Sequence, residues 1–352
     1  MKKVRIGVIG CGGIANGKHL PAHKHNPDSE MVAFCDIIVE RAEKAAKEYG
    51  IPGAKVYKDY KELLKDKTID AVLVLTPNIS HSFISVDAMK AGKHVMCEKP
   101  MAINSKEAKK MLDAAKKYKR ILTIGYQSRY TPQAIFLKKE CEKGTFGDIY
   151  YAKAQAIRRR AVPTWGVFLD EKQQGGGPLI DIGVQALDLT LYLMGNPKPV
   201  TTSGMAVAKI GNTPGHVGLL GSWDHTKFTV EDYASGFVRF EDGRSLILES
   251  SFAANIEPTE IVRSNLLGTK AGAELDDKLR IFGERCGALT NGEVFGYPEV
   301  NHFKEEFIAF YKSIEEDTPV PVPADQAINC LRILEGIYRS AEAGREIKLN
   351  EF

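Results

Sequence analysis

Lys99 is the residue of this chain whose surroundings best suit charge-stabilising chemistry. It stands between Glu98 and Pro100, directly after the apolar stretch 94–97. A proline disfavours helical backbone in the residue before it, so we expect Lys99 to be extended and its ammonium group to point into the crevice at the strand ends. An ammonium group held in this way can stabilise negative charge that develops on a substrate oxygen. Glu98 can orient it, although a lysine chosen at random is usually a surface charge.

A glycine-rich turn near the amino terminus is a second candidate site. The spacing G-x-G-x-x-G/A is matched by Gly10, Gly12 and Ala15, with Gly13 and Ile14 between them. Gly10 permits a tight turn, Gly12 lets backbone N–H groups approach a pyrophosphate, and Ala15 lets a helix pack on the preceding strand. The helix N-terminus, which we expect at Gly13 and Ile14, favours phosphate charge. We therefore predict a dinucleotide site here rather than an ordinary loop.

Asp36 ends the apolar stretch 31–35, which we predict as the next strand. A carboxylate at this position accepts hydrogen bonds from ribose hydroxyls and repels the additional phosphate of NADP. We therefore predict that the cofactor is NAD, favoured over NADP, even though Arg41 lies close by in the sequence.

A third group, Thr76, Pro77, Asn78 and His81, follows the apolar stretch 69–75. At the carboxyl end of a parallel strand, Asn78 and His81 can reach ribose or nicotinamide groups of the cofactor. The alternative is an ordinary helix-capping turn with a solvated histidine, and the two interpretations have equal support from the residues alone.

A fourth group lies in the segment Gly175–Asp188, which starts with three glycines and Pro178. Glycines and proline at this position favour the start of a helix. Asp181, Gln185 and Asp188 are spaced i, i+4 and i+7, which places them on one face of that helix. Such a face can lie in solvent, but the glycines before it favour a closely packed site.

The elements around the first groups alternate as a parallel sheet requires. We predict a doubly wound α/β domain, of Rossmann type, over residues 1–127, with its ligand at the carboxyl ends of the strands. The strands are expected at 4–9, 31–35, 69–75, 94–97 and 121–125, and helices at 39–49, 82–91 and 105–118.

Beyond Tyr130 the pattern changes to longer alternating segments. We predict that residues 128–352 form an α+β domain with a large, mostly antiparallel open sheet, one face of it buried and the other available for a partner. Two apolar helical stripes near the carboxyl terminus, separated by a proline-rich link, are expected to be core packing, with these helices returning toward the first domain. The expected strands are 149–157, 202–210, 234–240 and 245–252, the last two joined by a hairpin turn at 242–243.

The composition excludes several other classes of protein. Lys and Arg number 48 against 45 Asp and Glu, a net charge of +3, so we expect neither nucleic acid nor a membrane surface as a partner. Hydrophobic residues make up 43% and charged residues 26%, as in soluble globular enzymes. The six cysteines have no CxxC spacing, so we predict no disulfide framework and no metal site. With no apolar run long enough to cross a bilayer, we expect a cytoplasmic protein.

Together these motifs resemble the Gfo/Idh/MocA oxidoreductases, the group of glucose–fructose oxidoreductase and inositol dehydrogenase, in their order and spacing. The resemblance implies that Lys99 is the active-site lysine, that Asp181 contacts substrate hydroxyls, and that Pro100 follows a cis bond. It also implies a cofactor contact from Gln127, a substrate contact from Arg129, and homodimers or homotetramers formed through the open sheet. The matching segments are the glycine-rich turn, Thr76-Pro77-Asn78 with His81, Glu98-Lys99-Pro100, Gly125-Tyr126-Gln127 through Arg129, and Gly175–Asp188.

Gln185 departs from the family pattern. Many members have a histidine that acts as acid and base at this position, four residues after the aspartate. An amide can hydrogen-bond to a hydroxyl but cannot take its proton near neutral pH. Either Lys99, partly deprotonated by its environment, or another residue relays the proton, or oxidation is slow or absent. Asp181, Tyr126 and His81 are the other candidates, and the sequence does not rank them.

We therefore predict an NAD-dependent dehydrogenase that oxidises a secondary hydroxyl of a sugar, glycoside or cyclitol, or reduces the matching ketone. Lys99 would stabilise the reacting oxygen, and Asp181 with Gln185 would orient neighbouring hydroxyls. Trp165 either stacks on a sugar ring or belongs to the core. Two other functions stay open: an enzyme that uses NAD transiently for elimination or glycosidic cleavage, and a non-catalytic regulator that binds NAD and sugar, which Gln185 suggests.

Overall fold

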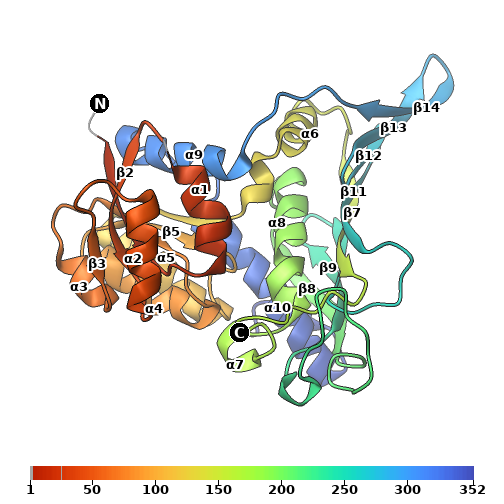
Figure 1. Ribbon diagram of the computed structural model, residues 1–352. Coiled ribbons are helices and arrows are strands. Elements are labelled where there is room, and N and C mark those ends of the chain that lie inside the picture. Colours follow the sequence, from red (N-terminus) through yellow and green to blue (C-terminus); the bar gives the residue numbers. More distant parts are fainter. Residues whose placement is uncertain (1–2, 25) are drawn as a thin grey trace. The chain divides into compact units, whose positions relative to one another are not determined.

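The computed structural model describes residues 3–24 and 26–352, which fall into two compact units (Figure 1). The first unit combines the described residues up to Tyr130 with the segment Val300–Ile328. The second unit combines Thr131–Glu299 with Asn329–Phe352. Each unit is therefore built from two stretches of the chain that are distant in sequence.

The first unit contains a six-stranded parallel sheet in the order β3-β2-β1-β4-β5-β6. The chain runs outward from β1 to β3 and then crosses back to β4 on the other side of β1. Between β1 and β4 the direction of winding reverses, and doubly wound sheets bind ligands at the carboxyl ends of the strands on either side of this point. The strands are β1 (Val4–Ile9), β2 (Ser29–Cys35), β3 (Lys55–Tyr57), β4 (Ala71–Val74), β5 (His94–Glu98) and β6 (Leu122–Gly125).

The central strands of this sheet are buried on both faces, which is why β4 reads as an uninterrupted apolar run. Helix α9 (His302–Glu316) adds Phe303, Phe307 and Phe310 to the core beneath β1, so this stripe is core packing as predicted. The other helices are η1, a π-helix (Ala15–His19), α1 (Leu20–His23), α2 (Val39–Tyr49), α3 (Tyr60–Lys65), α4 (Asn78–Lys90), α5 (Ser105–Tyr118) and the 3-10 helix η2 (Gln127–Tyr130).

The second unit contains a nine-stranded sheet in the order β14-β13-β12-β11-β7-β10-β9-β8-β15. Within this sheet, among the described residues, β7–β10 is the one parallel pair and all other pairs are antiparallel, so the predicted fold class, an α/β chain with a mostly antiparallel second sheet, is confirmed. The strands are β7 (Ile149–Arg158), β8 (Pro199–Val207), β9 (Tyr233–Phe240), β10 (Ser245–Ser251), β11 (Glu260–Gly268), β12 (Ala271–Leu275), β13 (Leu279–Arg285), β14 (Ala288–Val294) and β15 (Ile347–Lys348).

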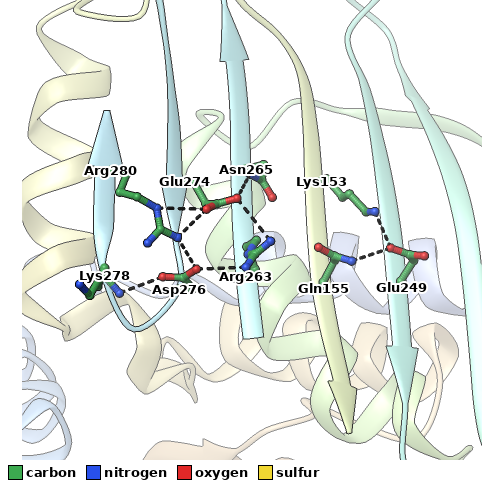
Figure 2. A network of polar contacts seen from close by, with 9 residues as sticks. All are labelled: Lys153, Gln155, Glu249, Arg263, Asn265, Glu274, Asp276, Lys278 and Arg280. Carbon is green, nitrogen blue, oxygen red and sulfur yellow. Dashed lines mark hydrogen bonds and ion pairs between the residues drawn. The ribbon is translucent and has the colours of Figure 1, made fainter. Parts of the chain in front are cut away.

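The two faces of this sheet differ in character. Helix α8 (Val184–Leu193) covers one face, where its Thr190 hydroxyl lies 2.7 Å from the Ser264 hydroxyl of β11. The opposite face carries a network of charged and amide side chains across β10, β7, β11, β12 and β13 (Figure 2). The remaining helices associated with this unit are α6 (Pro132–Glu142), α7 (Glu171–Gln174), the π-helix η3 (Leu179–Gly183), the 3-10 helix η4 (His225–Lys227) and α10 (Ala324–Ala343), the first residues of which belong to the first unit.

Several element boundaries differ from the sequence prediction. Helix α4 begins at Asn78, four residues earlier than expected, and β8 ends at Val207 rather than at residue 210. The short strand β3 and the four strands between Glu260 and Val294 had no counterpart in the prediction. Among the described residues, none of the helices is both long and apolar enough to cross a bilayer.

Candidate functional site

The glycine-rich turn after β1 has the geometry that a dinucleotide requires. Gly10 has a φ of 96°, and a Cβ added there would lie 2.6 Å from the carbonyl oxygen of Leu75, so a larger residue does not fit. A Cβ added at Gly12 or Gly13 would meet no heavy atom within 4 Å. The turn is therefore closed toward β4 and open on the side where a pyrophosphate would approach the helix N-terminus. Behind it, Ala15 is completely buried.

Asp36 joins this turn to the end of β2. Its Oδ2 accepts the backbone N–H of Cys11 at 2.9 Å, and its Oδ1 accepts that of Ile38 at 2.9 Å. Each carboxylate oxygen can accept a second hydrogen bond, so these contacts leave capacity for ribose hydroxyls. The two residues that follow, Ile37 and Ile38, are uncharged and expose 82% and 41% of their surface.

His81 lies completely buried, so the solvated histidine weighed as an alternative is wrong. Its Nδ1 is 2.8 Å from the carbonyl oxygen of Pro100, and its Nε2 is 2.7 Å from that of Thr76. Burial lowers the pKa of His81, although these two carbonyls and the charge of Glu98 act in the opposite direction. The ring therefore joins the turn after β4 to the loop after β5. Asn78, the first residue of α4 after Pro77, is also buried.

Lys99 follows directly on β5 and is partly exposed. Its peptide bond to Pro100 is cis, as the resemblance implied. Glu98 is buried, and its Oε2 accepts the backbone N–H of Lys99 at 2.7 Å. Burial alone would raise the pKa of Glu98, but its hydrogen bond to His19 and the nearby positive charges lower that pKa overall. An anionic Glu98 thus lies directly behind the lysine.

His19 is a residue of this region that the sequence analysis missed. It is completely buried on η1, and its Nε2 lies 2.7 Å from Oε1 of Glu98. The ring packs edge-on against Phe303 and Phe307, at centroid distances of 5.2 and 5.6 Å. The sequence offers one signal for it, a histidine four residues after Ala15 on the helix that follows the glycine-rich turn.

Three candidates from the segment after β6 also lie in the first unit. Gln127 is partly exposed at the start of η2, and Tyr126 before it is buried. Arg129, predicted to contact substrate, is buried, and its Nη1 donates to the Pro321 carbonyl at 3.0 Å and to Oε1 of Gln326 at 2.7 Å. Its guanidinium therefore binds the segment that follows α9.

In the second unit, Asp181 lies on the π-helix η3 and Gln185 on the first turn of α8. Asp181 is 8% exposed and Gln185 partly exposed, whereas Asp188 is completely buried and 3.9 Å from the Cys330 sulfur. Gln185 and Asp188 are three residues apart on the regular helix α8, whereas Asp181 precedes them on a π turn, so one face shared by all three stays a prediction. Single π turns occur frequently at functional sites.

Glu231 lies two residues before β9 in the chain, and its carboxylate holds the start of this helix. The sequence analysis missed this residue as well. Its two oxygens accept the backbone N–H groups of Gly177 at 2.8 Å and Leu179 at 3.0 Å, and the Tyr338 hydroxyl donates to it at 2.9 Å. Burial raises the pKa of Glu231 despite these donors. A Cβ at Gly176 would lie 2.1 Å from the Tyr338 hydroxyl oxygen, so the glycines of this turn are required by close packing.

Trp165 is 57% exposed, which excludes the core position weighed as an alternative. Its ring lies edge-on to that of Phe168, with the centroids 6.2 Å apart. An exposed indole face is available for stacking on a ligand.

Comparisons with known proteins agree with these motifs. Residues 4–126 match the family described as "Oxidoreductase family, NAD-binding Rossmann fold", and residues 138–349 match its "C-terminal alpha/beta domain". The chain is 34% identical over 346 residues to D-glucoside 3-dehydrogenase of Escherichia coli strain K12, covering 98% of this chain and 97% of that protein. It is 27% identical over 361 residues to myo-inositol 2-dehydrogenase of Thermotoga maritima, covering 99% of each.

A solved structure shows the same fold over the whole chain. The aldose–aldose oxidoreductase of Caulobacter crescentus, crystallised with glycerol, superposes with a TM-score of 0.83 at 26% identity and covers 99% of this chain and 100% of that one. Both family models and a relative at 34% identity thus span nearly all of the sequence. The chain belongs to the Gfo/Idh/MocA family of oxidoreductases.

Proposed function

We propose that this protein is an NAD-dependent dehydrogenase that transfers a hydride between nicotinamide and a secondary hydroxyl, or the matching ketone, of a sugar, glycoside or cyclitol. The observation that carries the proposal is the position of Lys99. It follows β5 at the same edge of the parallel sheet as the open glycine-rich turn after β1. The relatives named as glucoside and inositol dehydrogenases support the substrate class.

The residues of the first unit would hold the cofactor and stabilise charge. Bound NAD supplies the hydride acceptor, and the protein supplies alignment and electrostatics. The backbone N–H groups at Gly12 and Gly13 would bind the pyrophosphate, and Asp36 would accept hydrogen bonds from the ribose hydroxyls. Lys99 directs its ammonium group at the substrate oxygen, where negative charge develops as the hydride leaves the carbon.

NAD is the proposed cofactor rather than NADP. Asp36 repels a 2′-phosphate, and Ile37 and Ile38 after it offer no positive charge to bind one. Titration of the protein with each nucleotide, followed by intrinsic fluorescence, tests this preference. Equal affinity for NAD and NADP would contradict it.

In the second unit, Asp181 and Gln185 orient the substrate hydroxyls, and Trp165 stacks on the sugar ring. Gln185 cannot accept a proton, and both ring nitrogens of His81 face backbone carbonyls. Of the remaining candidates, Lys99, Asp181 and Tyr126, we propose Lys99 as the group that takes the hydroxyl proton, after which its ammonium group stabilises the charge on the substrate oxygen. The positive charge that this creates lies beside the anionic Glu98.

The open face of the nine-stranded sheet is the proposed surface for homodimers or homotetramers. It carries ion pairs such as Lys153–Glu249, 2.7 Å apart (Figure 2). It also carries apolar residues such as Leu267, which is 43% exposed and pairs with Tyr151 on the neighbouring strand. Mixed apolar and charged surfaces of this kind are typical of protein interfaces. Sedimentation equilibrium tests this, and a monomer at micromolar concentration would contradict it.

The function is tested by reduction of NAD at 340 nm against a panel of sugars, glycosides and inositols. We expect NADH to accumulate with at least one of them, and Lys99→Ala to abolish this while NAD affinity stays within a few-fold. Cleavage of a glycoside without net NADH would instead support transient oxidation. Binding of NAD and sugar without any absorbance change in a single turnover would support a non-catalytic regulator, and unchanged turnover in Lys99→Ala would remove Lys99 from the mechanism.

A further inference from the structure

We infer that two buried histidines, His19 and His81, are positioning residues for Lys99, an inference that rests on the proposed role of Lys99 in hydride transfer. The residues on either side of the lysine are each held by one of them. His19 contacts the Glu98 side chain at 2.7 Å, and His81 contacts the Pro100 carbonyl at 2.8 Å. Both histidines are completely buried.

On one side, the contacts form a chain from His19 to the backbone of the lysine. Oε1 of Glu98 faces Nε2 of His19, and Oε2 accepts the N–H of Lys99, both at 2.7 Å. Since the two carboxylate oxygens are bound in different directions, the carboxylate plane is fixed, and with it the backbone at Lys99. Within the described residues, Nδ1 of His19 has no hydrogen-bond partner. Nε2 is therefore the nitrogen through which His19 holds the Glu98 carboxylate.

On the other side, His81 connects two loops at the carboxyl edge of the sheet. Its ring lies between the carbonyl of Pro100, after β5, and that of Thr76, after β4, at 2.8 and 2.7 Å. A neutral imidazole carries one N–H, which one of these two carbonyls accepts, so rotation of the ring would leave that carbonyl without its donor. The lysine is thus held at both ends of a three-residue segment.

The two histidines come from the elements that build the proposed cofactor site. His19 ends the π-helix that follows the glycine-rich turn, and His81 lies on the first turn of α4. Their contacts therefore fix the position of Lys99 relative to the turns on which NAD would lie. A misplacement of about 1 Å can lower a rate by about 100-fold, because hydride transfer and charge stabilisation both depend on alignment.

The chain offers a matched control for a purely structural role. His23 lies one turn after His19, on α1, and is 2% exposed. It also packs edge-on against Phe307, at 5.3 Å, and its Nε2 lies 3.0 Å from the Ser29 hydroxyl. Its hydrogen bond and ring contacts are made with Ser29, Phe307 and Tyr311. Replacement of His23 therefore disturbs the same core but leaves the contacts of His19 with Glu98 and of His81 with Pro100 in place.

The experiment compares His19→Leu, His19→Gln, His81→Leu and His23→Leu with the unsubstituted protein. Thermal melting reports stability, and steady-state kinetics report kcat and KM. Acetylation of Lys99 by acetic anhydride, followed by mass spectrometry in the protein without substrate and normalised to the exposed Lys172, reports the environment of the lysine directly. A glutamine amide can place a donor near the position of imidazole Nε2, so His19→Gln preserves the contact to Glu98.

We expect His19→Leu and His81→Leu to lower kcat by about 100-fold, with KM changed less than about threefold and the Lys99 acetylation rate altered. His19→Gln is expected to recover most of kcat. His23→Leu should melt at a temperature as low as His19→Leu but keep kcat within about threefold and leave the Lys99 acetylation rate unchanged.

Equal losses of kcat in His19→Leu and His23→Leu, or an unchanged Lys99 acetylation rate in His19→Leu, would overturn the inference. If the unsubstituted protein transfers no hydride, the proposed function fails, and acetylation alone still decides whether the histidines position Lys99. Should His19→Leu not fold, His81→Leu decides it, because an unchanged Lys99 acetylation rate in that variant would overturn the inference.

Discussion

Replacing Glu231 by alanine tests whether a buried carboxylate holds the start of the helix that carries Asp181. The substitution removes the acceptor for three donors, namely the N–H groups of Gly177 and Leu179 and the Tyr338 hydroxyl. Each buried donor left without an acceptor costs about 1–3 kcal/mol. Relief of the cost of burying the carboxylate offsets part of this sum. We therefore expect the free energy of unfolding to fall by about 3–5 kcal/mol, the lower part of the range of about 3–9 kcal/mol for three unpaired donors.

The loss should depend on pH, because burial raises the pKa of Glu231 above its usual value of 4.5. A carboxyl group whose pKa is raised in the folded state contributes its stability fully below the unfolded pKa. This contribution is lost as the pH rises through the folded pKa. The difference in stability between the unsubstituted protein and Glu231→Ala should therefore be largest near pH 4 and decrease toward neutral pH.

Urea unfolding from pH 4 to pH 8, together with kcat for hydride transfer, measures both effects. Asp87→Asn is a suitable control, because it weakens another tyrosine–carboxylate contact, Tyr60 to Asp87 at 2.8 Å, in the first unit. We expect kcat to be unchanged in this control. Glu231→Ala should lower kcat, because it loosens η3, the turn that carries Asp181. A stability difference that is constant with pH, or a kcat equal to that of the control, would refute the reasoning.

Three further predictions concern the cofactor turn and proton transfer. Gly10→Ala should abolish NAD binding and destabilise the protein by about 1–3 kcal/mol. The backbone φ of 96° is unfavourable for alanine, and its Cβ would lie 2.6 Å from the Leu75 carbonyl oxygen. As a control, Gly53→Ala, at a φ of 81° with no atom within 4 Å, should leave NAD affinity unchanged in the same titration. Asp36→Ala should weaken NAD binding about tenfold through the loss of ribose contacts, and it should reduce the preference for NAD over NADP. An unchanged ratio of the dissociation constants for NAD and NADP would show that Asp36 does not select the cofactor. Gln185→His should introduce a titrating group with a pKa near 6.5 into the pH profile of kcat, whereas an identical profile would place this position away from the proton transfer.

Much of the first unit could be predicted from the sequence, because its signals are local. Helices α2 and α5 were predicted at their observed bounds, since each has a regular apolar stripe, and α5 also begins at a capping residue, Asn104, whose side chain accepts the N–H of Glu107. Helix α4 was predicted to begin four residues too late. Its buried residues include polar ones such as His81, Ser82 and Ser85, so it has no apolar stripe to mark its first turn.

The second sheet was only partly predicted, because the strands β11 to β14 lack a clear apolar alternation. In β14 the first six residues are exposed, and the strand has no buried face to produce a pattern. Strands of this kind are defined by pairing with their neighbours, as β14 pairs with β13 along its whole length. Pairing partners are a tertiary property that a single sequence does not display.

The candidate site shows the same division between local and long-range information. The glycine-rich turn, Asp36 and Lys99 were identified because short motifs carry their chemistry. His19 and Glu231 were missed because their partners lie 79 and 52–54 residues away in the sequence. A regular α-helix was assumed at Asp181, where Leu179–Gly183 form a π turn.

The contribution of α9 to the first core has a practical consequence for dissecting the protein. A fragment that stops at residue 127 would lose Phe303, Phe307, Phe310 and Tyr311, which are all at least 93% buried against the first sheet and its helices. Four aromatic side chains cover about 600–1,000 Å² of apolar surface, more than a typical monomer exposes in one patch. Such a fragment should aggregate, whereas joining residues 1–130 to 300–328 through a short flexible linker should yield a soluble nucleotide-binding module.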